Sequence, residues 1–349
     1  MSKFLSAFLA TLLLSAIELG APRKESEQPV LKIGVVGLDT GHAPDYSEVI
    51  NTAAHDDPIF SGTRVVTAFH PFEEDKVEKN LQRMSELDIE IVGSLEDLLA
   101  AVDAVMLHAT DGRRRLQLAL RIMQSGKPLW MNKPVAHELA DVIAIYRTAQ
   151  QLNVPVFSAS SLRYVPHAIE IRNGKYGPVL GATAYSPAHL DERHVDFFWY
   201  GIHGVETLFT VMGPGCRNVV RTHIGSTDVI TGVWEDGRVG TVRGGRNWRS
   251  GGARRYGGVV WCEQDIVAIG PFAGYAHLVK EIVRFFRTGS SPVEANETIE
   301  IYAFMQAADR SKNEAGVPID LAVVMEEHSR KADIRLSEAE AQILVGYGP

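Results

Sequence analysis

The sequence contains little cysteine. Its 349 residues include only two, Cys216 and Cys262, which could form at most one disulfide bond. No Cys-x-x-Cys spacing occurs, so a zinc site built from cysteine is not expected. A chain of this length buries a large core. Apolar packing, rather than disulfides or structural metals, is therefore expected to stabilise the fold.

The sequence also lacks an excess of positive charge. Asp and Glu number 43 against 35 Lys and Arg, which gives a net charge of −8. A nucleic-acid-binding protein carries a basic surface, so nucleic acid is not expected as a partner. Apolar residues make up 45% and charged residues 22% of the chain, which is ordinary for globular domains and excludes a disordered or fibrous protein.

Long apolar runs are absent apart from one at the N-terminus, Phe4–Ile17. The run is shorter than the roughly 20 residues of a membrane-spanning helix, but it fits the apolar segment of a secretory signal peptide. No twin arginine precedes it, because the first arginine is Arg23. We therefore expect residues 1–21 to be a signal peptide or an uncleaved anchor, and the protein to be exported to the periplasm or cell envelope. A buried or interfacial N-terminal helix is the alternative.

Short apolar runs alternate with helical segments over residues 30–158. The expected strands, which are too apolar to have a face in water, are Leu31–Leu38, Val65–Phe69, Ile89–Val92, Ala104–His108, Pro128–Met131 and Val154–Ser158. The expected helices are Asp45–Ala54, Glu73–Leu87, Glu96–Ala101, Arg114–Gln124 and Glu138–Leu152. This alternation predicts βαβ units and a parallel sheet. We therefore predict a Rossmann-type, dinucleotide-binding-like domain over residues 30–158, followed by a second domain over residues 159–349.

The first strand of such a domain turns into its first helix at a glycine-rich loop that binds phosphate. In the G-x-G-x-x-G register Gly37 keeps the first glycine, while Asp39 replaces the second and His42 the third. The Asp39 carboxylate adds negative charge and bulk beside a pyrophosphate. A tight turn that binds no nucleotide is therefore the alternative. After the second strand, His70 stands where an acidic residue usually holds the ribose.

Several short motifs along the chain resemble the glucose-fructose oxidoreductase, inositol dehydrogenase and MocA (Gfo/Idh/MocA) family. They are Ala109-Thr110, Ser125-Gly126-Lys127, Asn132-Lys133-Pro134-Val135-Ala136, Arg163-Tyr164 and Gly201-Ile202-His203-Gly204-Val205-Glu206. The resemblance implies an α/β protein. Its N-terminal Rossmann domain would be followed by a C-terminal α/β domain with a large, mostly antiparallel sheet, which often forms the homo-oligomer interface. It also implies NAD- or NADP-dependent oxidation or reduction of a sugar or cyclitol hydroxyl.

The resemblance further implies two catalytic residues. Lys133 matches the lysine of the family's E-K-P motif, with Asn132 in place of the glutamate. His203 matches the histidine of the D-x-x-x-H motif, with Trp199 in place of the aspartate. Removing hydride from a carbinol requires a group that takes the hydroxyl proton, and histidine titrates near neutral pH. The alternatives are a lysine that caps the sheet edge and a histidine buried in the core.

The remaining binding residues follow from the same reasoning. The expected cofactor contacts are Gly37, Leu38, Asp39, Thr40, His42, His70, Thr110 and Asn132, and the expected substrate contacts are Arg163, Tyr164, Trp199 and Tyr200. Aromatic faces beside polar side chains suit a sugar. His189, Asp191 and His194 do not have the spacing of a standard zinc site, so no metal is expected. A carbohydrate-binding protein that keeps the fold without the hydride chemistry is the alternative function.

Two arginine-rich segments stand out in this acidic chain. Arg243–Arg255 is also rich in glycine and is expected to form a loop between strands. Arg113–Arg115 opens the fourth helix, where positive charge opposes the helix dipole. These arginines either meet a bound anion or lie in solvent.

Overall fold

The computed structural model describes residues 30–53, 57–72, 76–249 and 252–344. The expected signal peptide or anchor over residues 1–21 lies outside these residues. Within them, no helix has both the length and the apolar character needed to cross a membrane.

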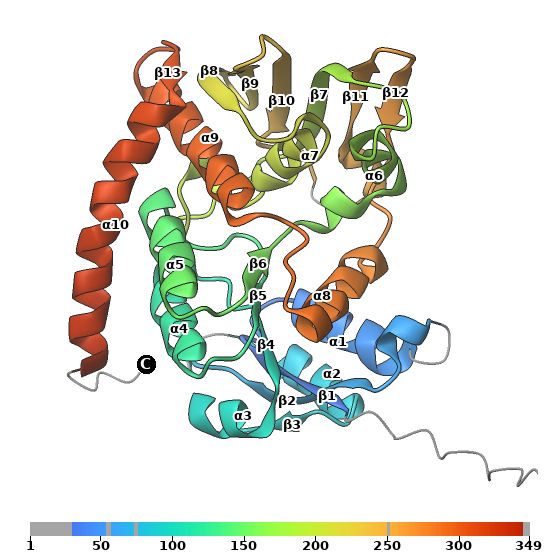
Figure 1. Cartoon of the computed structure of the whole chain (residues 1–349), viewed down its shortest axis with the longest axis vertical. Coiled ribbons are helices and arrows are strands. Elements are labelled where there is room, and N and C mark those ends of the chain that lie inside the picture. The colour runs from blue at the N-terminus through green and yellow to red at the C-terminus, as the bar shows by residue number, and fades with distance from the viewer. Residues whose placement is uncertain (1–29, 54–56, 73–75, 250–251, 345–349) are drawn as a thin grey trace, which may run out of the picture.

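The N-terminal half forms a parallel sheet. Its strands are β1 (Leu31–Val36), β2 (Thr63–Phe69), β3 (Glu90–Ile91), β4 (Ala104–Leu107), β5 (Leu129–Met131) and β6 (Val156–Ser158). They pair in the order β3-β2-β1-β4-β5-β6 (Figure 1). The order reverses at β1, which is the doubly wound arrangement that the alternating pattern predicts. All residues of β4, β5 and β6 are buried, so the apolar runs seen in the sequence are explained by helices on both faces.

Five helices connect these strands. They are α1 (His42–Thr52), α2 (Glu78–Glu86), α3 (Leu95–Ala101), α4 (Gly112–Gln124) and α5 (Leu139–Gln151). The helix α3 begins where Ser94 Oγ accepts a hydrogen bond from the Asp97 N–H at 3.1 Å, which is an ordinary N-cap. The expected second helix begins later in the structure, at Glu78 rather than Glu73.

The second sheet is mixed and mostly antiparallel. Its strands are β7 (Val179–Pro187), β8 (Cys216–Ile224), β9 (Thr227–Trp234), β10 (Val239–Gly245), β11 (Gly257–Cys262), β12 (Ile266–Ile269) and β13 (Ile319–Asp320), in the order β12-β11-β7-β10-β9-β8-β13. Only the β7–β10 pair is parallel among these described strands. The expected fold class, a Rossmann-type sheet followed by an α/β domain with a large antiparallel sheet, is confirmed.

The C-terminal helices join the two halves. The helices α6 (Pro166–Arg172), α7 (Ile202–Met212) and α9 (Ala295–Asn313) pack on one face of the second sheet. In contrast, α8 (Ala276–Thr288) returns to the first half beside α1, and α10 (Leu321–Leu344) runs along α5 (Figure 1). The apolar side of α8 shares one core cluster with β1, β5 and β6, and the rings of Phe157 and Phe285 lie 4.7 Å apart. The chain therefore crosses between the halves several times.

Candidate active site

A cavity of about 270 Å³ lies where the carboxyl ends of the first sheet meet the start of α7. Its lining residues are Thr40, His42, Lys133, Ser161, Leu162, Trp199, Tyr200, His203, Gly252, Ala253, Tyr256, Phe272 and Tyr275. The residues come from both halves of the chain. The structure thus brings together both predicted catalytic residues and the predicted aromatic pair Trp199 and Tyr200.

Lys133 lies two residues beyond the end of β5, and only 8% of it is exposed. Its Nζ lies 4.7 Å from the centre of the Trp199 ring and 5.3 Å from that of Tyr200. Within the described part of the chain, the ammonium group makes no hydrogen bond and no ion pair. Burial, together with the nearby positive charge of Arg115, lowers the pKa of Lys133 to about 8. The cavity therefore contains a cation whose hydrogen-bonding capacity is free.

His203 lies at the start of α7, which carries it to the same cavity. Its Nδ1 is 2.8 Å from Ser160 Oγ, two residues beyond the end of β6. Burial and the charge of Lys133 lower the pKa of His203 well below 6.5, so the imidazole is neutral at physiological pH. When Nδ1 donates its proton to Ser160, Nε2 presents a lone pair that can accept a proton.

His42 is a third nitrogen base on the cavity wall. The Asn132 side-chain N–H donates to His42 Nδ1 at 2.9 Å, which places the ring proton of His42 on Nε2. Burial and Lys133 lower the pKa of His42 to about 3. The ring stacks on Tyr46 at 5.5 Å and meets the edge of Tyr275. Asn132, which stands where the related motif has a glutamate, therefore orients His42 as a neutral hydrogen-bond donor.

The loop between β1 and α1 keeps features that suit a dinucleotide phosphate. Gly37 has a φ of +93°, and a Cβ there would lie 2.1 Å from the Ala109 nitrogen, so only glycine fits. Gly41 is the N-cap of α1 and provides no side chain to cap it. Among the described residues, the N–H groups of Thr40 and Gly41 have no acceptor. Free amides at a helix N-terminus form a site for an anion.

Asp39 occupies the second glycine position of this loop. Its carboxylate accepts hydrogen bonds from the Thr110 N–H at 2.9 Å and from the Thr110 hydroxyl. Arg193 donates to the same hydroxyl oxygen at 3.1 Å, so a positive charge lies close by. The Thr110 carbonyl in turn accepts a hydrogen bond from His194. The carboxylate is thus turned toward the loop after β4, which reduces but does not remove the repulsion expected from the sequence.

His70 and Leu38 fix the other side of this loop. His70 Nδ1 accepts the Leu38 N–H at 3.0 Å, so the histidine orders the first loop residue after Gly37. A ribose contact by His70 stays a prediction. Taken together, the loop residues fit a nicotinamide dinucleotide: the glycine turn and the free amides of Thr40 and Gly41 remain, and Asp39 is held aside by Thr110.

We expect Asp39→Asn to bind NAD about fivefold more tightly than the parent, because removing one negative charge near the phosphates is worth about 1 kcal/mol. Asparagine keeps an oxygen that accepts the Thr110 N–H. Asp39→Gly, which restores the glycine of the motif, also loses that hydrogen bond and should gain less. Calorimetric titration with NAD checks this, with Glu48→Gln on the outer side of α1 as the control. Weaker binding by Asp39→Asn than by the parent would contradict the expectation.

Residues 31–160 match the family model described as an oxidoreductase family with an NAD-binding Rossmann fold, GFO_IDH_MocA. The N-terminal domain belongs to the Gfo/Idh/MocA family. The resemblance proposed from the motifs is thereby confirmed, together with the oxidoreductase class and the nicotinamide cofactor class that it implies.

Solved structures share the fold of this chain along most of its length. A probable dehydrogenase from Thermotoga maritima has a TM-score of 0.69 and 16% identity, covering 84% of this chain and 100% of that one. A putative myo-inositol dehydrogenase from Sinorhizobium meliloti gives 0.69 and 16%, covering 83% and 99%. The scyllo-inositol dehydrogenase from Lactobacillus casei, with bound NAD(H) and scyllo-inositol, gives 0.66 and 16%, covering 84% and 99%. Comparison with curated protein sequences gives no match.

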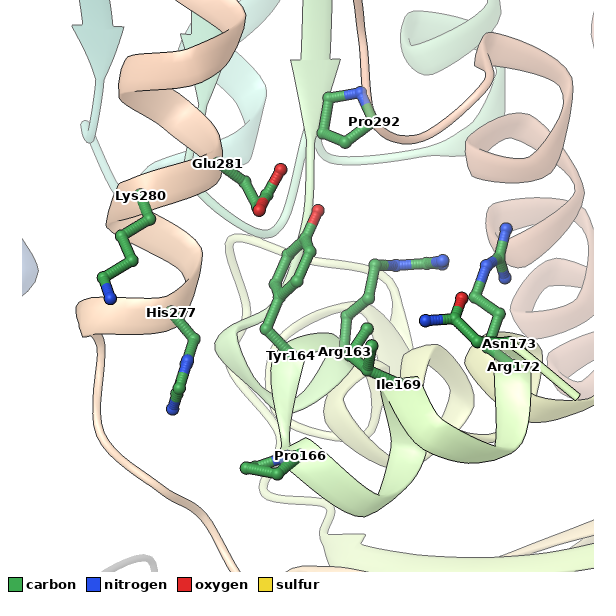
Figure 2. Close-up of a pocket in the computed structure, with 10 residues that line it drawn as sticks. All are labelled: Arg163, Tyr164, Pro166, Ile169, Arg172, Asn173, His277, Lys280, Glu281 and Pro292. Carbon is green, nitrogen blue, oxygen red and sulfur yellow. The ribbon is translucent and has the colours of Figure 1, made fainter. Parts of the chain in front are cut away.

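Arg163 and Tyr164, which we expected to contact substrate, line a different pocket of about 490 Å³ between α6 and α8 (Figure 2). Arg163 donates to Glu206 at 2.8 Å and to Glu297 at 2.7 Å, and all three side chains are buried. This network ties the segment after β6 to α7 and α9. The structure therefore does not bring Arg163 and Tyr164 to the cavity of Lys133.

The arginine-rich segments are largely structural. Arg115 is fully buried and donates to the carbonyl oxygens of Val135 at 2.9 Å and Asn132 at 2.7 Å, which fixes the loop that carries Lys133. Arg113 pairs with Asp111 at 2.7 Å. The loop expected over Arg243–Arg255 was wrong in part, because residues 243–245 belong to β10, where they pair with both β7 and β9.

Sequence reasoning missed several lining residues of this cavity. Tyr256, Phe272 and Tyr275 come from loops before β11 and α8, far along the chain from the motifs. Ser160 could have been found, because residues just beyond a parallel strand's carboxyl end commonly reach the site. His194 stacks on Trp199 with ring centres 5.1 Å apart, so this expected polar cluster supports the tryptophan.

Among the described residues, no group of three or more His, Cys, Asp or Glu side chains could hold a metal ion.

Proposed function

We propose that the chain is an NAD(P)-dependent oxidoreductase that oxidises a hydroxyl group, or reduces the corresponding ketone, of a sugar or cyclitol. The proposal is based on one observation. Lys133 and His203, which come from different halves of the chain, line the same cavity beside the nucleotide loop. The aromatic rings of Trp199, Tyr200, Tyr256 and Tyr275 line the same cavity and suit the C–H faces of a sugar.

Each residue has a definite task in this reaction. When bound, the nicotinamide cofactor supplies or accepts the hydride. Lys133 donates a hydrogen bond to the substrate oxygen and stabilises the negative charge that develops there. His203 Nε2 accepts the hydroxyl proton during oxidation and returns it during reduction, while Ser160 holds the ring in the required tautomer. The amides of Thr40 and Gly41 would hold the phosphates.

The test uses the purified full chain. Denaturation followed by mass spectrometry identifies any nucleotide that copurifies, and calorimetry measures the affinity for NAD and NADP. A panel of monosaccharides and cyclitols is then assayed for turnover by absorbance of the reduced cofactor. Turnover that depends on Lys133 and His203 supports the proposal. A chain that binds sugar without any turnover, and loses affinity in Trp199→Ala but not in Lys133→Ala, would be the carbohydrate-binding protein instead.

We also propose that the protein forms a homo-oligomer through the outer face of its second sheet. Trp261, Val239 and Val233 lie in one row across β11, β10 and β9, linked by direct pairing through Gly181. Directly paired residues point to the same face. Trp261 is 43% and Val239 45% exposed in the single chain. The row is therefore an exposed apolar surface that a second copy of the chain would bury.

We expect the double variant Trp261→Glu, Val239→Glu to sediment as a monomer at a concentration where the parent is oligomeric, because it places charges in an apolar interface. Leu152→Glu, which changes an exposed leucine at the end of α5, is the matched control and should leave the assembly intact. Sedimentation velocity measures the species. A monomeric parent would overturn the proposal, as would an unchanged oligomer in the double variant.

We propose finally that the protein is exported, on the evidence of the apolar run Phe4–Ile17 and its flanking lysine. Fusing residues 1–29 to a reporter enzyme that is active only outside the cytoplasm should give activity. Replacing Leu12 and Leu13 by arginine in the fusion is the control and should abolish it. Reporter protein confined to the cytosol in the first fusion would contradict export.

A further inference from the structure

The candidate active site has positive charge but no acidic partner for it. Of the described residues that line the cavity, none is aspartate or glutamate. The charged groups that lower the pKa values of His42, His203 and Lys133 are basic as well, namely the side chains of Lys133 and Arg115. A buried cation without a counter-charge is unfavourable unless a ligand supplies one.

The second cation, Arg115, does not relieve this imbalance. It lies behind the loop of Lys133 and donates only to backbone carbonyl oxygens, among them those of Val135 and Asn132. The carboxylate that acts on Arg115 is that of Asp39, which already accepts a hydrogen bond from the Thr110 N–H. The Lys133 ammonium is therefore left facing the cavity with two aromatic rings, those of Trp199 and Tyr200, as its neighbours.

The departures from the related motifs explain how this charge arose. Asn132 and Trp199 stand where the E-K-P and D-x-x-x-H motifs each have a carboxylate. Asn132 donates to His42 instead, and Trp199 presents its ring to Lys133. Two negative charges are thus missing from a site that keeps its lysine. Among the described lining residues nothing supplies the complementary charge, so a ligand is its expected source.

We propose that the substrate is a sugar acid, a polyhydroxylated carboxylic acid whose carboxylate pairs with Lys133 and accepts a hydrogen bond from His42 Nε2. This inference rests on the proposed function and specifies its substrate class. The ammonium group has three donors, so it can bind the carboxylate and the reacting oxygen together. A single lysine matches one carboxylate charge better than the double charge of a phosphate. The cavity volume of about 270 Å³ suits a small molecule of this kind.

The test compares acids with their uncharged amides on the full-length chain. Glucuronate, galacturonate and gluconate are each titrated by calorimetry against glucuronamide, galacturonamide and gluconamide, with and without NAD. We expect at least one acid to bind about tenfold or more tightly than its amide, because a charged hydrogen bond is lost in the amide. Lys133→Met should abolish this preference. Lys175→Met, which removes a lysine exposed at the end of α6, should leave it unchanged.

A second variant restores the missing charge. Trp199→Glu places a carboxylate at a position next to the Lys133 ammonium and should reduce the preference for the acid by about tenfold. The inference is overturned if no acid binds better than its amide, if the preference survives in Lys133→Met, or if glucose 6-phosphate binds more tightly than every sugar acid. Binding of acids without turnover would refute the proposed oxidoreductase and leave this inference standing. Turnover of neutral sugars without preference for acids would support the proposed oxidoreductase and overturn this inference.

Discussion

A Lys133→Met variant should lose turnover and yet unfold at a higher denaturant concentration than the parent. Loss of the group that stabilises the developing oxyanion should lower kcat by about 10²–10³. The gain in stability has a different cause. The folded chain lowers the pKa of Lys133 from 10.5 to about 8, so the charged side chain costs roughly 3 kcal/mol of folding free energy at neutral pH. Methionine has a similar length and carries no charge.

The pH dependence provides the check on this explanation. Below pH 8 the lysine is charged in both folded and unfolded states, so the advantage of methionine should be complete. As the pH rises from 8 to about 10.5, the folded state releases its proton first, and the advantage should shrink. Urea unfolding at pH 7 and pH 9.5 measures both values, with Lys175→Met as the control. A variant less stable than the parent at pH 7 would contradict this account of Lys133.

Replacing His203 by asparagine should lower kcat by about 10²–10⁴, the usual effect of losing a general base. Ser160→Ala should have a smaller effect, about tenfold, because it only loosens the ring that Ser160 holds at 2.8 Å. The shape of the pH profile separates the two roles. Burial lowers the pKa of His203 well below 6.5, so kcat/KM should show no acid limb near pH 6.5. It should fall above pH 8 as Lys133 loses its proton.

Steady-state rates of the parent, His203→Asn and Ser160→Ala between pH 5 and pH 10 test this assignment. The alkaline limb should persist in Ser160→Ala, because Lys133 is unchanged. His137→Asn is a suitable control, since His137 bonds to the Arg193 carbonyl and is not among the cavity residues. A His203→Asn variant with the parent rate would show that another group takes the proton and would contradict this assignment.

The N-terminal domain could be predicted closely because its signal is local. Strands such as Ala104–Leu107 are buried on both faces, so every residue is apolar and the run is visible without any knowledge of its neighbours. Helix ends such as Ser94 carry their own caps. In the C-terminal half, residues 243–245 were expected to belong to a loop because they are arginine and glycine, and the structure places them in β10. Their strand conformation depends on pairing with β7 and β9 on both sides.

The site could be predicted where a motif or a cluster of aromatic residues marked it. Lys133 and His203 each match a motif, and both line the cavity. The position of Arg163 could not be foreseen, because its partners Glu206 and Glu297 lie 43 and 134 residues away in the chain. The same holds for Asp39, which bonds to Thr110 across 71 residues. Such contacts depend on the packed structure, and a single sequence carries no record of them.

The return of α8 to the first sheet has a consequence for any attempt to treat the protein as modular. Leu278, Ile282 and Phe285 of this helix are fully buried in the same cluster as Ile33 and Phe157. A fragment ending at residue 158 would expose that apolar surface to water. The segment that looks like a complete nucleotide-binding unit in the sequence is thus not autonomous. Grafting it onto another substrate domain would succeed only if the donor supplied α8 as well.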